Sequence, residues 1–457
     1  MLIAKTKKIL SNFLISDYSM ILITLFFIIY SLFSSNVPKI LEIEHFFMII
    51  IIILLLFIYF FEHIKLNLKQ YLKNNILAFI FLGVITYGFF IGLYNNNSDK
   101  NILRDLFGVS SILSIFILIY FRDKNPKYIN FLFKVLVYTG LIFSIKTLIF
   151  YYIFLDHSNY PSGNPVQVAK YHFLYLENTI ILSLVFFLLK IYDHTEKKNL
   201  ISMVKYCVLL YFPLSVASIY SLRGPILFTF LIFIVFLTIK KKSFNGLIFS
   251  IFFLINSFFV LFIFIIYPLY YFIFHSKKIL IYTIGSFFFL FFILDHIYLW
   301  SAELSSLTHN NILFDHKIKK FDINFLNNRQ GEFSVFNENF TNFHIFFGKG
   351  LGALISNPVN NSNVLFFHNF SLYYFYKMGI VGIILIIFIF FFIVNKSLKI
   401  FFNFKNIENI DKNIYISLLA TLGYPLLLSA TYKSISFGFI LALFLIIKLN
   451  YNDTKNI

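Results

Sequence analysis

Residues 369–394 read NFSLYYFYKMGIVGIILIIFIFFFIV, and Lys377 is the one charged side chain among them. About 20 mainly apolar residues are enough for a helix to cross the hydrocarbon core of a bilayer. A chain exposed to lipid must satisfy its backbone hydrogen bonds internally, so such a stretch is expected to be helical. This segment therefore predicts a membrane-spanning helix.

Apolar runs of the same character recur along the whole chain. The other candidate spans are 18–33, 46–61, 76–93, 106–121, 131–154, 173–191, 201–219, 225–239, 279–299, 414–428 and 435–447, together with a long apolar block at 244–274. A hairpin within that block, near Asn256 and Ser257, gives 14 spans, whereas a re-entrant or buried segment gives 12. We therefore expect an all-α, polytopic transmembrane helical bundle of 12–14 spans, forming a single integral membrane domain over residues 1–457.

Composition supports this fold class. The chain has 457 residues, of which 59% are hydrophobic and 13% charged, and it contains 67 Phe. A soluble domain carries about a quarter charged residues. The net charge of +18 comes from short Lys and Arg clusters between apolar runs. Such clusters favour cytoplasmic loops and contact with anionic lipids over nucleic-acid binding.

The same clusters orient the spans, because cytoplasmic loops collect Lys and Arg. The resulting alternation puts both termini in the cytoplasm and residues 301–363 outside, as one large periplasmic loop. Loops longer than about 12–15 residues are usually functional or disordered. The many Phe residues of this loop argue against disorder, so we expect a folded external cap.

Arg223 is the first candidate site residue, in the sequence Ser221-Leu-Arg-Gly-Pro225 at the outer end of two apolar runs. Pro225 suits the first turn of a following helix, so the arginine would lie beside a helix N-terminus. A cation in that place forms a natural anion site. The alternative is an interfacial arginine whose head group reaches water.

Arg329 and the cluster Gly348-Lys-Gly350-Leu-Gly352 lie within the predicted external loop. A guanidinium group binds phosphate with two parallel hydrogen bonds. Gly-rich turns cradle phosphates through their backbone amides. No strand precedes this cluster, so it is neither a Walker loop nor a dinucleotide fingerprint. A plain loop-to-helix turn is an equal alternative for the glycines, as a solvated side chain is for Arg329.

His368 and Asn369 stand where the chain re-enters the membrane. The ordinary pKa of histidine makes it a serviceable general base, which could take a proton from a sugar hydroxyl. The alternative is an interfacial histidine with satisfied hydrogen bonds. No histidine or cysteine spacing indicates a metal site, so we expect neither a metal nor a cofactor.

Taken together, these motifs resemble the O-antigen polymerase (Wzy-type) and O-antigen ligase superfamily. Ser-Leu-Arg-Gly at 221–224 is similar to the family's Ser-x-Arg-Gly, and Arg329 with FFGKGLG at 346–352 is similar to its Arg and Gly-x-Gly turn. FHNFSL at 367–372 and KMGIVG at 377–382 resemble its His-Asn element and Gly-x-x-Gly helix start, and PSGNP at 161–165 is a weaker fourth piece. The resemblance covers residues 156–382 in the family's order. Phe333 departs from a frequent Trp, and Ile219 from the first Ser of a longer form of the Arg motif.

The resemblance implies a glycan donor on undecaprenyl pyrophosphate and a metal-independent, inverting glycosyl transfer. It implies that His368 activates the acceptor hydroxyl and that Arg223 and Arg329 hold the pyrophosphate. The substrate would also contact Ser221, Gly348, Gly350, Gly352 and Asn369. The expected location is the bacterial cytoplasmic (inner) membrane, with the active site facing the periplasm. The expected partners are the lipid-linked oligosaccharide, anionic lipids, a chain-length regulator and a flippase protein, with no nucleic acid.

Three alternatives stay open. A ligase would use the same donor and transfer the glycan to the lipid A core, but the Phe- and Ile-rich composition favours a polymerase. A flippase or other transporter of lipid-linked oligosaccharides usually shows two similar halves and charged groups near the midplane. The notable charges of this chain instead gather at its predicted outer face. A nonenzymatic scaffold or sensor is the third alternative.

Overall fold

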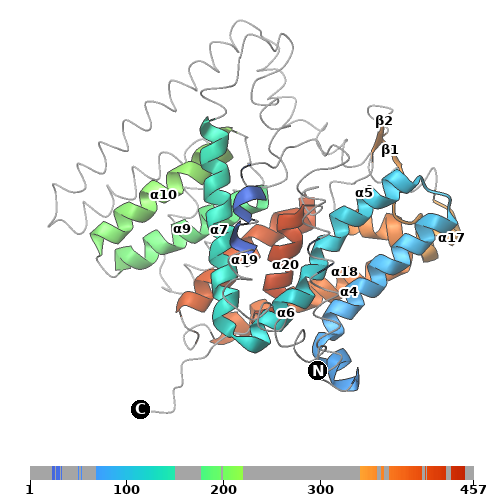
Figure 1. The fold of residues 1–457 in the computed structure, drawn as a ribbon, viewed down its shortest axis with the longest axis horizontal. Helices are drawn as coiled ribbons and strands as arrows, with labels where there is room; N and C mark the ends of the chain where they lie inside the picture. Colours follow the sequence, from blue (N-terminus) through green and yellow to red (C-terminus); the bar gives the residue numbers. More distant parts are fainter. Residues whose placement is uncertain are drawn as a thin grey trace, which may run out of the picture. The chain divides into compact units, whose positions relative to one another are not determined.

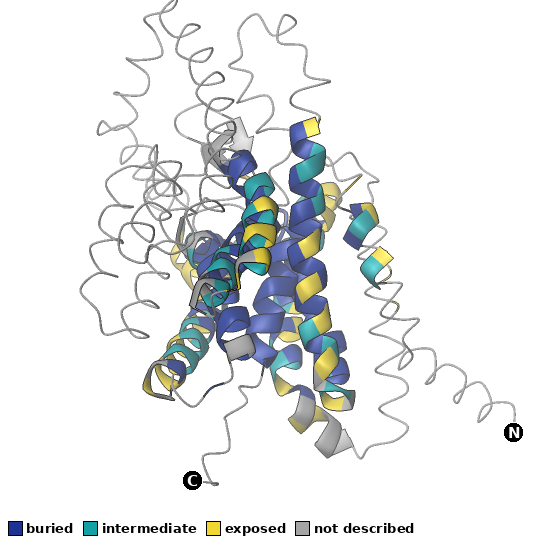
Figure 2. Ribbon diagram, turned by 90° about the vertical axis from the view of Figure 1, so that its left-hand side faces the viewer, coloured by how far each residue is buried: buried dark blue, intermediate teal, exposed yellow. Residues whose placement is uncertain are grey.

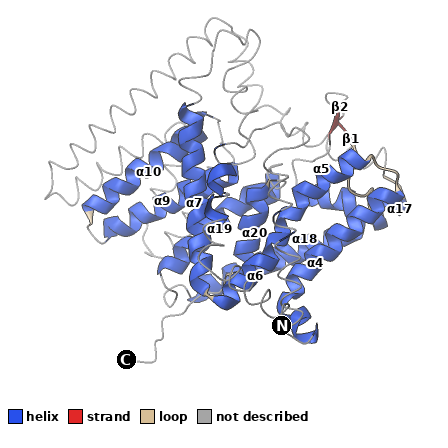
Figure 3. Cartoon of the chain, in the orientation of Figure 1, coloured by secondary structure: helices blue, strands red, loops and turns tan. Residues whose placement is uncertain are grey.

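The structure is a computed structural model of residues 1–457. It describes residues 68–149, 177–196, 199–219, 340–357, 362–364, 370–403, 409–428 and 434–447, with isolated positions at 23–25, 27–30, 32, 50, 53 and 407. Helix dominates this part of the chain (Figure 3). The expected all-α fold class is confirmed, and the described strands amount to two short segments.

The labelled helices follow one another along the chain (Figure 1). They are α4 (Leu68–Tyr94), α5 (Asp99–Ser110), the 3-10 turn η1 (Ser111–Ser114), α6 (Ile115–Lys124), α7 (Pro126–Ile149), α9 (Glu177–Glu196), α10 (Leu200–Ile219), α17 (Asn342–Phe347), α18 (Phe370–Asn403), α19 (Asn409–Leu428) and α20 (Ile435–Ile446). Strands β1 (Ile355–Asn357) and β2 (Ser362–Val364) lie between α17 and α18 in the chain.

Four described segments are long and apolar enough to cross a membrane, namely Asn75–Tyr94, Asp99–Asp123, Lys127–Ile149 and Phe370–Ile400. Each contains most of a span predicted from the sequence, and α9, α10, α19 and α20 likewise coincide with predicted spans. The chain is therefore a multi-pass, helical membrane protein. The predicted spans over 225–299 lie outside the described residues, and so does the choice between 12 and 14 spans.

The chain divides into two compact units. The first contains Met1–Lys242, Thr341–Leu354 and Leu365–Ile457, and the second contains Ser243–Phe340 and Ile355–Val364. Within the second unit, β1 and β2 pair antiparallel, with Ile355 opposite Val364. Part of the predicted external loop, Thr341–Leu354, thus belongs to the helical unit. The expectation of one domain over 1–457 with a loop at 301–363 stays a prediction.

Helix α20 forms the centre of the first unit, because every one of its residues is buried. Helices α4 and α18 instead keep exposed apolar side chains along one side, such as Phe90, Ile384 and Phe391. Figure 2 shows exposed residues along outward helix faces around a buried centre. In a membrane protein, such outward apolar faces are the surface that meets lipid.

Polar contacts fix the direction of the helices around α20. Gly438 near its start packs against Ser111 of η1, and Arg122 of α6 donates to the Ile446 carbonyl at its end, at 3.4 Å. Lys396 of α18 donates to the Phe444 carbonyl at 2.5 Å. Helices α6, α18 and α20 therefore run in the same direction, as the predicted alternation of spans requires. The two cations also suit the negative end of the α20 dipole.

Five of the hydroxyl groups buried in the helices donate to carbonyls one turn earlier, where the membrane offers no water. The pairs are Thr139 with Val135, Ser144 with Gly140, Ser183 with Thr179, Ser417 with Asn413, and Thr421 with Ser417, at 2.7–2.8 Å. Between α7 and α9, the Ser183 hydroxyl also donates to the Val137 carbonyl at 2.5 Å. Gly140 allows this approach, since a Cβ there would overlap the Thr179 carbonyl.

Gly140→Ala should therefore destabilise the protein by about 1–3 kcal/mol, the usual cost of overpacking. Gly83→Ala in α4 is the matched control, because nothing lies within 4 Å of its added Cβ. That control should be neutral or stabilising by about 0.5–1 kcal/mol, as alanine is the better helix former. Thermal unfolding in detergent, followed by size exclusion, measures both. Equal midpoints for the two variants would contradict the packing between α7 and α9.

Candidate functional site

The structure describes three of the residues that the sequence predicted for the site: Gly348, Gly350 and Gly352. The other predicted residues, Ser221, Arg223, Arg329, His368 and Asn369, lie outside the described residues. Their roles stay predictions. The described part of the candidate site consists of the segment Gly348–Leu354, named here the glycine loop, and the helices that contact it.

All three glycines adopt the left-handed backbone region, with φ of 78°, 77° and 81°. Residues with a Cβ rarely adopt this conformation. Space is also limiting, because a Cβ on Gly348 would lie 2.5 Å from the Met378 amide nitrogen, and one on Gly352 would lie 2.7 Å from that of Ile102. A Cβ on Gly350 would overlap the backbone of Gly92. The glycines thus let the loop pack against backbone of α4, α5 and α18.

Each backbone amide from Gly348 to Ala353 donates to an acceptor of the protein itself. The acceptors in order are the carbonyls of His344 (2.8 Å), Tyr376 (2.8 Å), Lys377 (2.8 Å) and Gly88 (2.9 Å), the Asp105 carboxylate (2.8 Å) and the Gly350 carbonyl (3.4 Å). These amides therefore do not form a free phosphate cradle in this arrangement. Substrate binding by the glycines stays a prediction, and it requires groups other than these amides.

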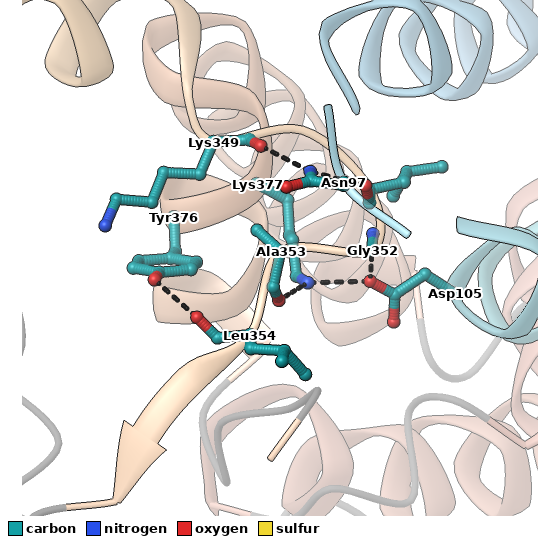
Figure 4. A network of polar contacts seen from close by, with 9 residues as sticks. Asn97, Asp105, Lys349, Gly352, Ala353, Leu354, Tyr376 and Lys377 are labelled. Carbon is teal, nitrogen blue, oxygen red and sulfur yellow. Dashed lines mark hydrogen bonds and ion pairs between the residues drawn. The ribbon is translucent and has the colours of Figure 1, made fainter. Parts of the chain in front are cut away.

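A buried ion pair holds the second half of the loop (Figure 4). The Lys377 ammonium lies 2.7 Å from Asp105 Oδ2, and both side chains are fully buried. The same carboxylate oxygen accepts from the Gly352 amide at 2.8 Å, and Lys377 also donates to the Ala353 carbonyl. Charged groups within membrane spans are costly and pair with one another or with backbone carbonyls. The pair satisfies both charges and joins α5, α18 and the loop.

Side-chain donors satisfy the loop carbonyls on its other side. The Asn97 amide group donates to the carbonyls of Lys349 and Leu351, both at 2.8 Å. The Tyr376 hydroxyl donates to the Leu354 carbonyl at 2.9 Å (Figure 4). Donors from the turn after α4 and from α18 therefore hold both ends of the loop.

Helix α18 is broken at Gly379, where φ is 57° and ψ is −138°. In an unbroken helix, the carbonyls of Tyr376 and Lys377 would accept amides four residues later. Here, next to the break, they accept the loop amides of Lys349 and Gly350. A Cβ on Gly379 would lie 2.5 Å from the Phe346 carbonyl oxygen, so glycine also makes room for the loop.

Two basic side chains lie where the chain passes from α17 into the glycine loop. His344 belongs to α17, and Lys349 is the second residue of the loop. The Lys349 ammonium lies 5.3 Å from the centre of the Tyr376 ring. Burial lowers the pKa of Lys349, and burial followed by the Lys349 charge lowers that of His344. Among the described residues, no three His, Cys, Asp or Glu side chains gather where they could hold a metal ion.

Sequence analysis did not identify Asp105, Asn97 or Lys377 as site residues. The span predicted from the sequence begins only at residue 106, whereas Asp105 lies inside helix α5. Lys377 carried a usable signal, because a lone charge within an apolar span needs a partner. Its partner could not be named, since 272 positions separate the two residues.

Comparisons with protein families, with curated proteins and with solved structures find no match to this chain.

Removing one partner of the ion pair should leave the other charge buried and unpaired. We therefore expect Asp105→Asn or Lys377→Met to lower the free energy of unfolding by about 3–5 kcal/mol. The double variant Asp105→Leu/Lys377→Met should recover much of that loss, because no charge remains buried. Unfolding in mixed detergent micelles measures all three.

Lys127→Met is the matched control, because it removes a lysine exposed at the start of α7. It should change stability by less than about 0.5 kcal/mol, as most surface substitutions do. Equal losses of stability in the single and double variants would show that the Lys377–Asp105 ion pair does not stabilise the loop.

Proposed function

We propose that this protein is an O-antigen polymerase, which joins oligosaccharide repeat units carried on undecaprenyl pyrophosphate. It would act at the outer face of the bacterial inner membrane as a metal-independent, inverting glycosyltransferase. The proposal rests on the ordered motifs of the sequence and on the multi-pass helical membrane fold. A lipid-linked donor requires an enzyme embedded in the membrane that holds the lipid.

One contact in the structure supports the proposal most directly. The glycine loop and the segment KMGIVG at 377–382 are separate pieces of the family resemblance, and they pack against each other. The Gly350 amide donates to the Lys377 carbonyl at 2.8 Å, and the break at Gly379 accommodates Phe346 and Gly348. Two motifs that are apart in sequence thus have a common structural purpose.

The proposed reaction assigns one task to each predicted residue. His368 accepts the proton of the acceptor hydroxyl, whose oxygen then attacks the anomeric carbon of the donor. The bond from that carbon to the pyrophosphate oxygen breaks, and undecaprenyl pyrophosphate leaves with the bonding electrons. Arg223 and Arg329 stabilise the negative charge on the leaving group.

The glycine loop would position two of these residues. It lies between Arg329 and His368 in the chain, and His368 stands two residues before the first residue of α18. The loop is fixed to the part of α18 before Gly379, because the backbone amides of Lys349 and Gly350 donate hydrogen bonds to its carbonyls. Catalytic groups must be held close to their working geometry, so a loop tied at this point would serve both.

A ligase remains the nearest alternative, because it shares the donor and differs in the acceptor. The Lys377–Asp105 pair is the observation that bears on transport, since intramembrane charges often mark transport pathways. Both of these charges, however, already have protein partners and are fully buried. The pair is therefore better explained as a contact that stabilises the fold than as a transport site.

The proposed roles can be tested in a gene-deleted host by the length of its surface polysaccharide on a gel. Restoring the wild-type gene should restore a ladder of repeats. His368→Ala should reduce polymer by about 100-fold or more, the usual range for a positioned base. Arg223→Lys should also reduce it by about 100-fold, since losing a donor to the developing negative charge costs about that much. Arg104→Lys, at an exposed position of α5, is the matched control and should give a normal ladder.

Membrane levels of each variant must match the wild type. If the deletion leaves lipid A core with a single repeat, the protein is the polymerase. If the deletion makes long lipid-linked chains accumulate that are not transferred to the lipid A core, the protein is the ligase. Normal ladders from both well-expressed site variants would refute the assigned residues.

A further inference from the structure

An exposed apolar surface lies beside the start of the glycine loop. It consists of Phe343, Phe346 and Phe347 of α17 and Phe90 and Tyr94 of α4, and is named here the aromatic patch. Helix α17 has no buried residue, and Phe346 is 58% and Tyr94 72% exposed. The Tyr94 and Phe343 rings lie 6.2 Å apart, so the two helices contribute to one continuous surface.

This surface continues the lipid-facing side of α4 beyond the end of the span. Of the four candidate spans, the one in α4 is the least buried within the protein. It ends at Tyr94, and the polar turn Asn95–Ser98 follows. Trp and Tyr side chains at the end of a span are typical of the membrane–water interface, and Tyr94 holds this place in α4. The aromatic patch therefore marks the level at which hydrocarbon gives way to lipid head groups.

Lys349 is held at this level. It follows α17 by two residues, and its carbonyl accepts from Asn97 of the polar turn at 2.8 Å. Its ammonium lies over the Tyr376 ring and makes no hydrogen bond or ion pair with any residue that the structure describes. Lys377, the fully buried cation of the site, has a carboxylate partner.

A half-buried ammonium without an anion is poorly satisfied, because the aromatic ring replaces only part of its hydration. His344 cannot neutralise Lys349, since it is itself a base. Lysine is a common phosphate ligand, acting as a point charge. The anions found at the membrane–water interface are the phosphates of lipid head groups, so one of these can pair with the Lys349 ammonium.

We propose that Lys349 binds a phosphate group carried by a membrane lipid. The phosphate belongs either to an anionic phospholipid or to a polyprenyl pyrophosphate, and the chemistry of recognition is the same for both. Tyr376 orients the lysine stem, and the aromatic patch receives the adjoining acyl or prenyl chain. This inference depends on the membrane fold and does not require the proposed glycosyl transfer.

Native mass spectrometry of the purified full-length protein tests the inference, with phosphatidylglycerol, undecaprenyl pyrophosphate or phosphatidylcholine added. Lys349→Met keeps the apolar stem over Tyr376 and removes the charge. It should weaken binding of at least one of the two anionic lipids by roughly tenfold, as the loss of a charged hydrogen bond predicts. Lys349→Arg should keep most of the binding, and phosphatidylcholine should respond to neither variant.

Lys100→Met is the matched control, because it removes one exposed charge from the first turn of α5. If Lys349→Met loses binding of phosphatidylglycerol alone, the site is one for a membrane phospholipid. If it loses binding of undecaprenyl pyrophosphate, Lys349 belongs to the donor site. Equal binding of both anionic lipids by Lys349→Met and Lys100→Met would overturn the inference. If Lys349→Met lowers the melting temperature, Lys349→Gln provides the same comparison.

Discussion

The buried ion pair between Lys377 and Asp105 is the interaction on which the described site depends. Either charge alone would be costly within a membrane span, so each makes the other tolerable. The third participant is the backbone, since the carboxylate accepts the Gly352 amide and the ammonium donates to the Ala353 carbonyl. A loop that would otherwise lie at the surface is thereby fixed between α5 and α18.

Backbone hydrogen bonding explains why the loop is rich in glycine. A non-helical segment at the edge of a membrane must find partners for every amide and carbonyl. Four of the six amides from Gly348 to Ala353 donate to backbone carbonyls of neighbouring helices, so the loop has to approach those helices without intervening side chains. The close contact of Gly350 with Gly92 shows this most clearly, because both positions lack a Cβ.

The sequence was sufficient to predict the spans that the structure describes, because long apolar runs leave few structural alternatives. Their bounds differ where polar residues extend a helix, as when α18 continues past 394 to Asn403. The site was harder to predict. Glycine spacing at 348–352 suggested an anion cradle, but spacing does not reveal where the amides point. Asp105 could not be matched with Lys377, since the contact depends on tertiary packing alone. Arg223, Arg329 and His368 stay predictions.

The break at Gly379 divides α18 into two segments that have different constraints on their sequence. The segment before Gly379 shares its hydrogen bonds with the loop, so an inserted or deleted residue there would misalign the acceptors of the Lys349 and Gly350 amides. The segment from Ile380 onward makes its backbone hydrogen bonds within the helix, and its contacts with neighbouring helices are made by side chains, such as the Lys396 bond to the Phe444 carbonyl. Apolar substitutions at its exposed positions, such as Ile384 and Phe391, are therefore easier to accommodate than any change of length before Gly379.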